Sequence, residues 1–235
     1  LVSAHDGGPL IETVPENLVP KTKEEVQALQ TAIANHVGEL GGWKIVAGQD
    51  EPLCAPVPAN RYFENGATLD TARHRFIISE IEVAVKLKAD LPAGSDLAAA
   101  EAAIESIHPV IEMIGNPFVD RAAQSKDLLL GDLQSNGAIV VGPAVDNGIR
   151  AELATLPVSL SYDGAVAHSV DKGANWEDIL KALSWLSTHA EGRGLGLKAG
   201  HVIITGARAL LARGDAKEIE GQLGAWGKVN CTITG

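Results

Sequence analysis

Two glutamates lie two residues apart in an apolar segment of the chain, FIISEIEVAVKL (76–87). β-Branched residues are frequent in this segment, which predicts a strand. Side chains two positions apart in a strand share a face, so the carboxylates of Glu80 and Glu82 project together from Cα atoms about 6.5 Å apart. Unpaired carboxylates beside a core would cost several kcal/mol or take up protons. A bound hard cation removes this cost, so the pair predicts a divalent metal site.

A third acid has a similar setting. Glu112 is an isolated charge inside HPVIEMI (108–114), which reads as a short buried strand. Three carboxylates would suit Mg²⁺ or Mn²⁺, both of which favour oxygen ligands. The alternative is that Glu80 and Glu82 lie on a solvated strand face, but apolar residues on both faces of the segment disfavour it.

The surrounding elements follow from capping residues and hydrophobic periodicity. Thr22 and Glu25 form a capping box that starts a helix over 22–40, and Asn175 caps a second long helix over 176–192. Further predicted elements are a strand at 41–48, a long loop at 51–67, a helix at 97–107, a helical turn at 116–130 and short antiparallel strands from 137 onward. Strands outnumber helices without alternating with them, which favours an α+β fold around a mixed or antiparallel sheet.

Length and composition limit the function classes. The 235 residues suffice for one sizeable domain, which we divide into an N-terminal arm and helical cap (1–60) and a core domain (61–235). A formal net charge of −11 argues against nucleic acid or anionic membranes as partners, and no segment is apolar enough to predict a membrane span. Cys54 and Cys231 lack metal-ligand spacing, which indicates free thiols in a reducing compartment and a cytoplasmic location.

Several segments, in collinear order over nearly the whole chain, resemble the 2-keto-4-pentenoate hydratases and 4-oxalocrotonate decarboxylases of the fumarylacetoacetate hydrolase superfamily. The most specific matches are SEIEVAV (79–85) and LKAGHVIITG (197–206). The other matching segments are GGWKI (41–45), HPVIEMI (108–114), KDLLLGDLQSNGAIVVG (126–142), ILKALSWLSTHAEGRGLGLKAGHVIITGA (179–207) and LGAWGKVNCTITG (223–235).

The resemblance implies a mixed β-sandwich roll, with a few flanking helices, that holds one divalent cation. It also implies roles for individual residues: Glu80, Glu82 and Glu112 as metal ligands, Lys44 and Asp132 as catalytic residues, and Ser135 and Thr205 as substrate-binding residues. The implied activity is a Mg²⁺- or Mn²⁺-dependent lyase, a hydratase, acting on a small 2-hydroxydienoic or 2-oxo acid through an enolate. Such roll folds commonly pair through sheet surfaces, so we expect a homo-oligomer.

Four segments depart from the family pattern. IVAGQDEP follows the Gly-Trp-Lys motif, and RYFENGATL (61–69) replaces a segment in which Asp or Tyr precedes Gly-x-Leu. DLQS (132–135) replaces Asp-Asn-Ala-Ser, and TGA (205–207) replaces Thr-Gly-Ser. The metal triad is retained while much of the substrate shell differs. The alternatives are therefore a 4-oxalocrotonate-type decarboxylase, an acylpyruvate C–C hydrolase, and a non-catalytic binding or partner subunit derived from the family. For three of the residues a structural role is the other reading: a surface lysine for Lys44, and turn residues for Asp132 and Thr205.

Overall fold

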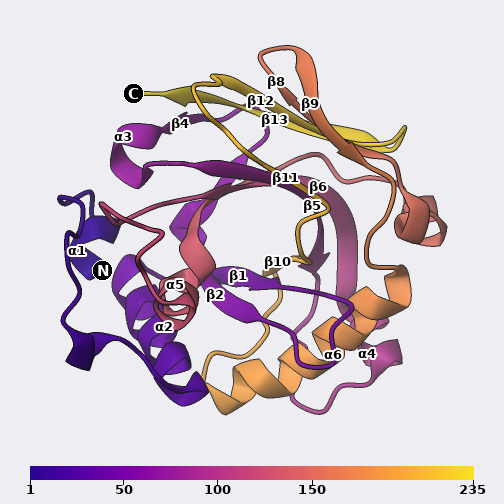
Figure 1. The fold of residues 1–235 in the computed structure, drawn as a ribbon. Coiled ribbons are helices and arrows are strands. Elements are labelled where there is room, and N and C mark those ends of the chain that lie inside the picture. Colours follow the sequence, from indigo (N-terminus) through magenta and orange to yellow (C-terminus); the bar gives the residue numbers. More distant parts are fainter.

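Strand β5 (Ile78–Leu87), which carries Glu80 and Glu82, pairs along its whole length with the antiparallel strand β6 (Ile104–Ile114). A computed structural model describes residues 1–235 of the chain, apart from the side chain of Arg73. Two β-sheets form the body of the molecule, and helices pack around them (Figure 1). The β5–β6 pair lies at the centre of the larger sheet, so the strands that carry the glutamates have pairing partners on both sides.

The larger sheet has eight strands in the order β2-β1-β10-β5-β6-β7-β3, with β11 pairing to β5 outside this path. Its remaining strands are β1 (Leu40–Ile45), β2 (Cys54–Pro58), β3 (Tyr62–Glu64), β7 (Asn136–Val141), β10 (Val202–Ile204) and β11 (Ala209–Ala212). The β1–β10 and β3–β7 pairs are parallel and the others are antiparallel, so the sheet is mixed.

The second sheet has five strands in the order β4-β13-β12-β8-β9 and covers one face of the larger sheet (Figure 1). Its strands are β4 (Thr68–Asp70), β8 (Val158–Tyr162), β9 (Ala165–Val170), β12 (Glu218–Leu223) and β13 (Gly227–Thr234). The main core includes Ile81 and Val83 from β5 with Leu160, Ile219 and Val229 from this sheet. Because side chains alternate along β5, Glu80 and Glu82 point away from this core, to the other face.

Helices border the larger sheet at two places, with α1, α2 and α5 grouped together and α4 beside α6 (Figure 1). Their bounds are α1 (Val2–His5), α2 (Lys23–Val37), α3 (Thr71–His74), α4 (Leu97–Ala103), α5 (Lys126–Gly131) and α6 (Trp176–Gly192). The two predicted N-caps are confirmed, since Thr22 accepts the Glu25 amide and Asn175 forms a capping box with Asp178. Of the described helices, none combines the length and hydropathy that a membrane crossing needs.

Three sequence predictions about local structure are wrong. The helix predicted over 97–107 ends at Ala103, and Ile104 begins β6, because IESI pairs with β5 and buries Ile104 and Ile107 in the core. Tertiary pairing overrides helix propensity there. The helical turn predicted over 116–130 begins only at Lys126, after a Ser125 cap. The loop predicted over 51–67 contains β2 and β3, whose pairing partners, β1 and β7, lie in other parts of the sequence.

The predicted fold class is confirmed: the structure has two mixed sheets with a few flanking helices. Cys54 and Cys231 are both free thiols. The division of the chain near residue 60 stays a prediction.

Candidate metal centre

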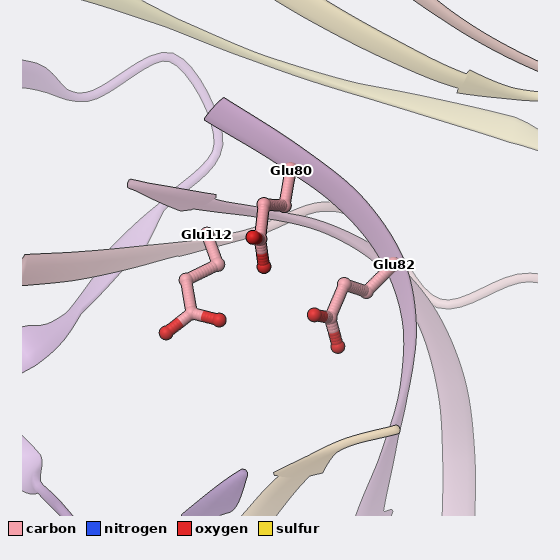
Figure 2. Close-up of side chains that lie close together, drawn as sticks. All are labelled: Glu80, Glu82 and Glu112. Atoms are coloured by element: carbon pink, nitrogen blue, oxygen red, sulfur yellow. The ribbon is translucent and has the colours of Figure 1, made fainter. Parts of the chain in front are cut away.

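Three carboxylates converge on the face of the larger sheet that points away from the second sheet. Glu80 lies directly opposite Glu112 in the β5–β6 register, and Glu82 is two residues further along β5. One carboxylate oxygen from each residue lies within 4.8 Å of the others, so the group could hold a metal ion. Figure 2 shows the three side chains reaching toward a common region. The predicted convergence of these acids is confirmed.

These carboxylates are costly without a counter-ion. Glu112 is fully buried, Glu82 is 2% exposed and Glu80 is half-buried. Burial, with the charges of Glu112 and Glu80, raises the pKa of Glu82 well above its ordinary value. Burial and the Glu112 charge likewise raise the pKa of Glu80 to about 7. Like-charged residues directly opposite each other in a sheet are destabilising, so this arrangement calls for a cation.

Lys44 supplies one positive charge from the neighbouring part of the sheet. Its Nζ donates to both carboxylate oxygens of Glu112, at 2.6 and 2.7 Å, and to the Gln134 carbonyl at 3.3 Å. Burial lowers the pKa of Lys44, but the charges of Glu112, Glu80 and Glu82 outweigh burial and raise it overall, so the side chain is an ammonium. Lys44 is only 8% exposed and its ammonium lies against Glu112, so the alternative of a surface lysine is wrong.

Two further donors hold the carboxylates in place. Asn136 Nδ2 donates to Glu112 Oε1 at 2.7 Å, and the Gly206 amide donates to Glu82 Oε2 at 2.7 Å. Gly206 has φ +108°, a conformation that favours glycine, which explains Thr-Gly at the end of β10. Neither donor is among the site residues predicted from the sequence. The Thr205-Gly206 turn was a signal for one of them, whereas nothing local marks Asn136.

A cavity of about 350 Å³ opens onto Glu80, Glu82 and Lys44. Its other described lining residues are Ile45, Val46, Ile78, Ile114, Arg121, Gln134, Gly206 and Ala207. Arg121 is likewise not among the site residues predicted from the sequence. Its Nη1 is buried and has no hydrogen-bond partner among the described residues, and burial lowers its pKa. A guanidinium with a free N–H in a cavity suits an anionic group such as a carboxylate.

The other predicted site residues lie elsewhere. Asp132 and Ser135 are buried and line a separate cavity of about 20 Å³, where Asp132 Oδ1 contacts His5 Nε2 at 2.8 Å. Thr205 is buried, and its hydroxyl donates to the Val83 carbonyl at 2.8 Å. Neither Asp132, Ser135 nor Thr205 lines the cavity beside the glutamates. Their catalytic and substrate-binding roles stay predictions.

Between Asp132 and Asn136 the chain makes an unusual turn. Leu133, Gln134 and Ser135 have φ of 51°, 50° and 60°. These values lie in the left-handed region, which residues other than glycine rarely adopt. Each such residue costs roughly 1–2 kcal/mol. The turn places the Gln134 carbonyl on Lys44 and the Asn136 amide on Glu112. Strain is thus concentrated where the chain positions the two groups beside the glutamates.

Charge and ligand chemistry fit a divalent cation. When all three carboxylates are ionised, the Lys44 ammonium compensates one of their charges, and the remaining two equal the charge of one such ion. All three candidate ligands are hard oxygen atoms, as Mg²⁺ and Mn²⁺ prefer. Nitrogen and sulfur ligands that would suit softer metals are absent from the described group.

We expect the affinity for Mg²⁺ to increase with pH. A cation must displace the proton of Glu80, whose pKa is about 7 in the metal-free protein. Apparent affinity should therefore fall at least about fivefold from pH 7 to pH 6, and further below that, because the proton on Glu80 competes with the cation. Titration calorimetry with MgCl₂ between pH 5.5 and 8.5 measures this change. Glu80→Gln should flatten the profile, whereas equal affinity of the wild type at every pH would exclude these ligands.

The same protons affect folding in the opposite direction. The folded pKa of Glu80 lies above its ordinary value of 4.5, so the folded protein binds this proton more tightly than the unfolded chain does. The resulting stability is complete below about pH 4.5 and is lost as pH rises through 7. A bound cation offsets this loss. The increase in Tm on adding Mg²⁺ should accordingly be larger at pH 8 than at pH 6.

No protein-family model matches the sequence. Solved structures with a similar fold include the 4-oxalocrotonate decarboxylase from Pseudomonas putida G7, complexed with magnesium and adipate. It is 20% identical with a TM-score of 0.81, and the match covers 99% of this chain and 93% of that one.

Two other similar structures are less alike. A 2-hydroxyhepta-2,4-diene-1,7-dioate isomerase from Mycobacterium marinum is 15% identical, with a TM-score of 0.62 over 83% of this chain and 75% of that one. A fumarylpyruvate hydrolase from Pseudomonas aeruginosa, in complex with Mn²⁺ and pyruvate, is 15% identical, with a TM-score of 0.62 over 82% of this chain and 88% of that one. The chain therefore shares the fold of these enzymes, and over nearly its whole length that of the 4-oxalocrotonate decarboxylase.

Proposed function

We propose that this protein is a divalent-metal-dependent lyase that acts on a small 2-oxo or 2-hydroxydienoic acid through an enolate. The observation that carries the proposal is the group of Glu80, Glu82 and Glu112, buried beside one ammonium at a cavity that also presents Arg121. Mg²⁺ or Mn²⁺ bound there would supply Lewis-acid stabilisation for the negative charge that develops on the 2-oxo oxygen.

Residues of the chain would hold the metal, bind the substrate's carboxylate and pack against its carbon chain. The three glutamates would hold the cation, and the Gly206 amide and Asn136 fix the orientation of two of them. Arg121, the second cation in the cavity, is placed to bind the substrate's carboxylate by charge-assisted hydrogen bonds. Ile45, Ile78 and Ile114 give the cavity apolar walls against which an unsaturated carbon chain can pack.

Lys44 is the group best placed to hold or move a proton. The pKa of Lys44 is raised by the negative charges of the glutamates, so Lys44 stays protonated while no cation compensates those charges. Once they are neutralised, burial remains and lowers its pKa toward that of a useful acid–base group. Asp132, the other residue implied by the resemblance, faces away from this cavity toward His5, which favours Lys44.

Hydration and decarboxylation share the same enolate. The hydratase proceeds by ketonisation of the dienol followed by addition of water, and the decarboxylase by loss of CO₂. The decarboxylase is the second candidate because the decarboxylase structure matches with a TM-score of 0.81, against 0.62 for the isomerase and hydrolase structures above. C–C hydrolysis is less well supported, since the described lining of the cavity includes no histidine to pair with a glutamate for water activation.

One pair of assays tests the proposal. We would follow the near-ultraviolet absorbance of 2-hydroxypenta-2,4-dienoate, and CO₂ release from 4-oxalocrotonate, each with MgCl₂ and with excess chelator. Turnover of one substrate that requires Mg²⁺ is expected. Absorbance loss without CO₂ would identify a hydratase, and CO₂ release a decarboxylase. Stoichiometric Mg²⁺ binding without turnover of either substrate, or of an acylpyruvate, would instead support a non-catalytic binding or partner subunit.

A further inference from the structure

His5, on the short N-terminal helix α1, joins two buried charged residues from distant parts of the chain. Its Nε2 contacts Asp132 Oδ1 at 2.8 Å, and its Nδ1 contacts Arg61 Nη2 at 2.8 Å. A guanidinium can only donate, so Nδ1 accepts from Arg61 and Nε2 carries the proton given to Asp132. His5 is 9% exposed, Arg61 2% and Asp132 1%. The imidazole therefore links the buried carboxylate of Asp132 to the buried guanidinium of Arg61.

Asp132 begins the strained turn beside the glutamates. Its carbonyl accepts the Ser135 amide at 2.7 Å, and the Ser135 carbonyl in turn accepts the Gly115 amide at 2.9 Å, which fixes the far end of the turn. The three residues with left-handed backbone, Leu133 to Ser135, belong to this turn, which presents the Gln134 carbonyl to Lys44. Next along the chain is Asn136, which holds Glu112. A residue that fixes the Asp132 side chain thus fixes the start of the segment that positions Lys44 and Glu112.

We propose that His5 is a positioning residue for the metal centre, acting through Asp132 and the 132–136 turn. The strained backbone of this turn costs conformational free energy, so the turn is stable only when contacts with the surrounding residues hold it in place. Loss of the imidazole would remove the hydrogen bond that His5 gives to the buried Asp132 carboxylate, and the turn would relax to bring Asp132 to water. The N-terminal segment would then be part of the site although it touches none of the three glutamates. The inference deepens the proposed function and rests on it for its effect on turnover, but its effect on metal binding does not depend on the substrate.

The test compares His5→Leu, His5→Gln and a control, His36→Ala. Gln can donate to Asp132 and accept from Arg61, so it should restore part of the effect. His36 contacts Asp6 at 3.0 Å at the surface, so its loss loosens the same N-terminal segment without touching Asp132. The dissociation constant for Mn²⁺ is measured by titration calorimetry, and Tm is recorded for each variant.

We expect His5→Leu to weaken Mn²⁺ binding about tenfold, the size of effect seen for residues that orient metal ligands. His5→Gln should stay within about threefold of the wild type and His36→Ala within twofold. In Asp132→Asn, adding His5→Leu should have little further effect, because both changes break the same link. If His5→Leu is too unstable to assay, His5→Ser serves, because its small polar side chain puts no apolar group against the buried charges of Asp132 and Arg61 and is too short to link them.

Unchanged Mn²⁺ affinity in a folded His5→Leu or His5→Ser variant would overturn the proposal, as would an equal loss in His36→Ala. Because calorimetry needs no substrate, these outcomes are separate from the fate of the proposed function. If the wild type bound Mn²⁺ but turned over no 2-oxo acid, the lyase proposal would fail while His5 could still be judged as a positioning residue.

Discussion

Replacing Glu82 by glutamine is expected to reduce metal-dependent turnover by at least about 10²-fold while leaving the metal-free fold intact. Glu82 is 2% exposed and supplies one of three converging carboxylates. Glutamine keeps the shape and an oxygen that can accept the Gly206 amide, but it removes the negative charge a divalent cation requires. The loss should therefore appear in metal affinity and in the rate, measured by calorimetry and by the substrate assays.

The stability of this variant is equally informative. Burial and neighbouring charges raise the pKa of Glu82, so a neutral amide at this place removes an unfavourable charge. The metal-free variant should be at least as stable as the wild type at pH 8, and Mg²⁺ should raise its Tm much less. Glu105→Gln is the matched control, because Glu105 belongs to the same β5–β6 strand pair but forms an exposed ion pair with Lys86. A variant that keeps full activity and only loses stability would make Glu82 structural.

Replacing Lys44 by methionine is expected to damage both activity and stability. Turnover should fall by about 10²–10⁴-fold if Lys44 transfers a proton. The metal-free protein should lose about 3–5 kcal/mol of unfolding free energy at neutral pH, because the fully buried Glu112 loses the ammonium that contacts both of its oxygens. Denaturant unfolding with and without MgCl₂ measures the loss, and Mg²⁺ should recover more stability in the variant than in the wild type.

Two controls separate the buried pair from lysine loss in general. Lys86→Met removes an exposed ion pair with Glu105 and should change stability by no more than about 1 kcal/mol. Adding Glu112→Gln to Lys44→Met removes the uncompensated charge and should restore much of the metal-free stability, though not turnover. If the single Lys44→Met variant were as stable as the wild type, Glu112 would not depend on Lys44 for its charge balance.

Several predictions from sequence succeeded because they depended on local geometry. Glu80 and Glu82 share a face since side chains alternate along any strand, whatever the strand's partners are. The caps at Thr22 and Asn175 form between residues three positions apart, so they too can be read directly. Where local preference and pairing disagreed, prediction failed: Ile104 to Ile107 follow a helix of strong formers, yet pairing with β5 makes them strand.

The sequence by itself determined the acidic pair, the isolated Glu112 in its apolar strand and the α+β class, because strand periodicity and burial patterns are local properties. Only the tertiary structure decided that Glu112 lies directly opposite Glu80 and that Lys44 holds Glu112. It also decided that Asp132 faces His5 across 127 positions of the chain, instead of facing the cavity. Those relations depend on strand register and on the path of the turn at 132–136, which long-range packing selects and no short segment encodes.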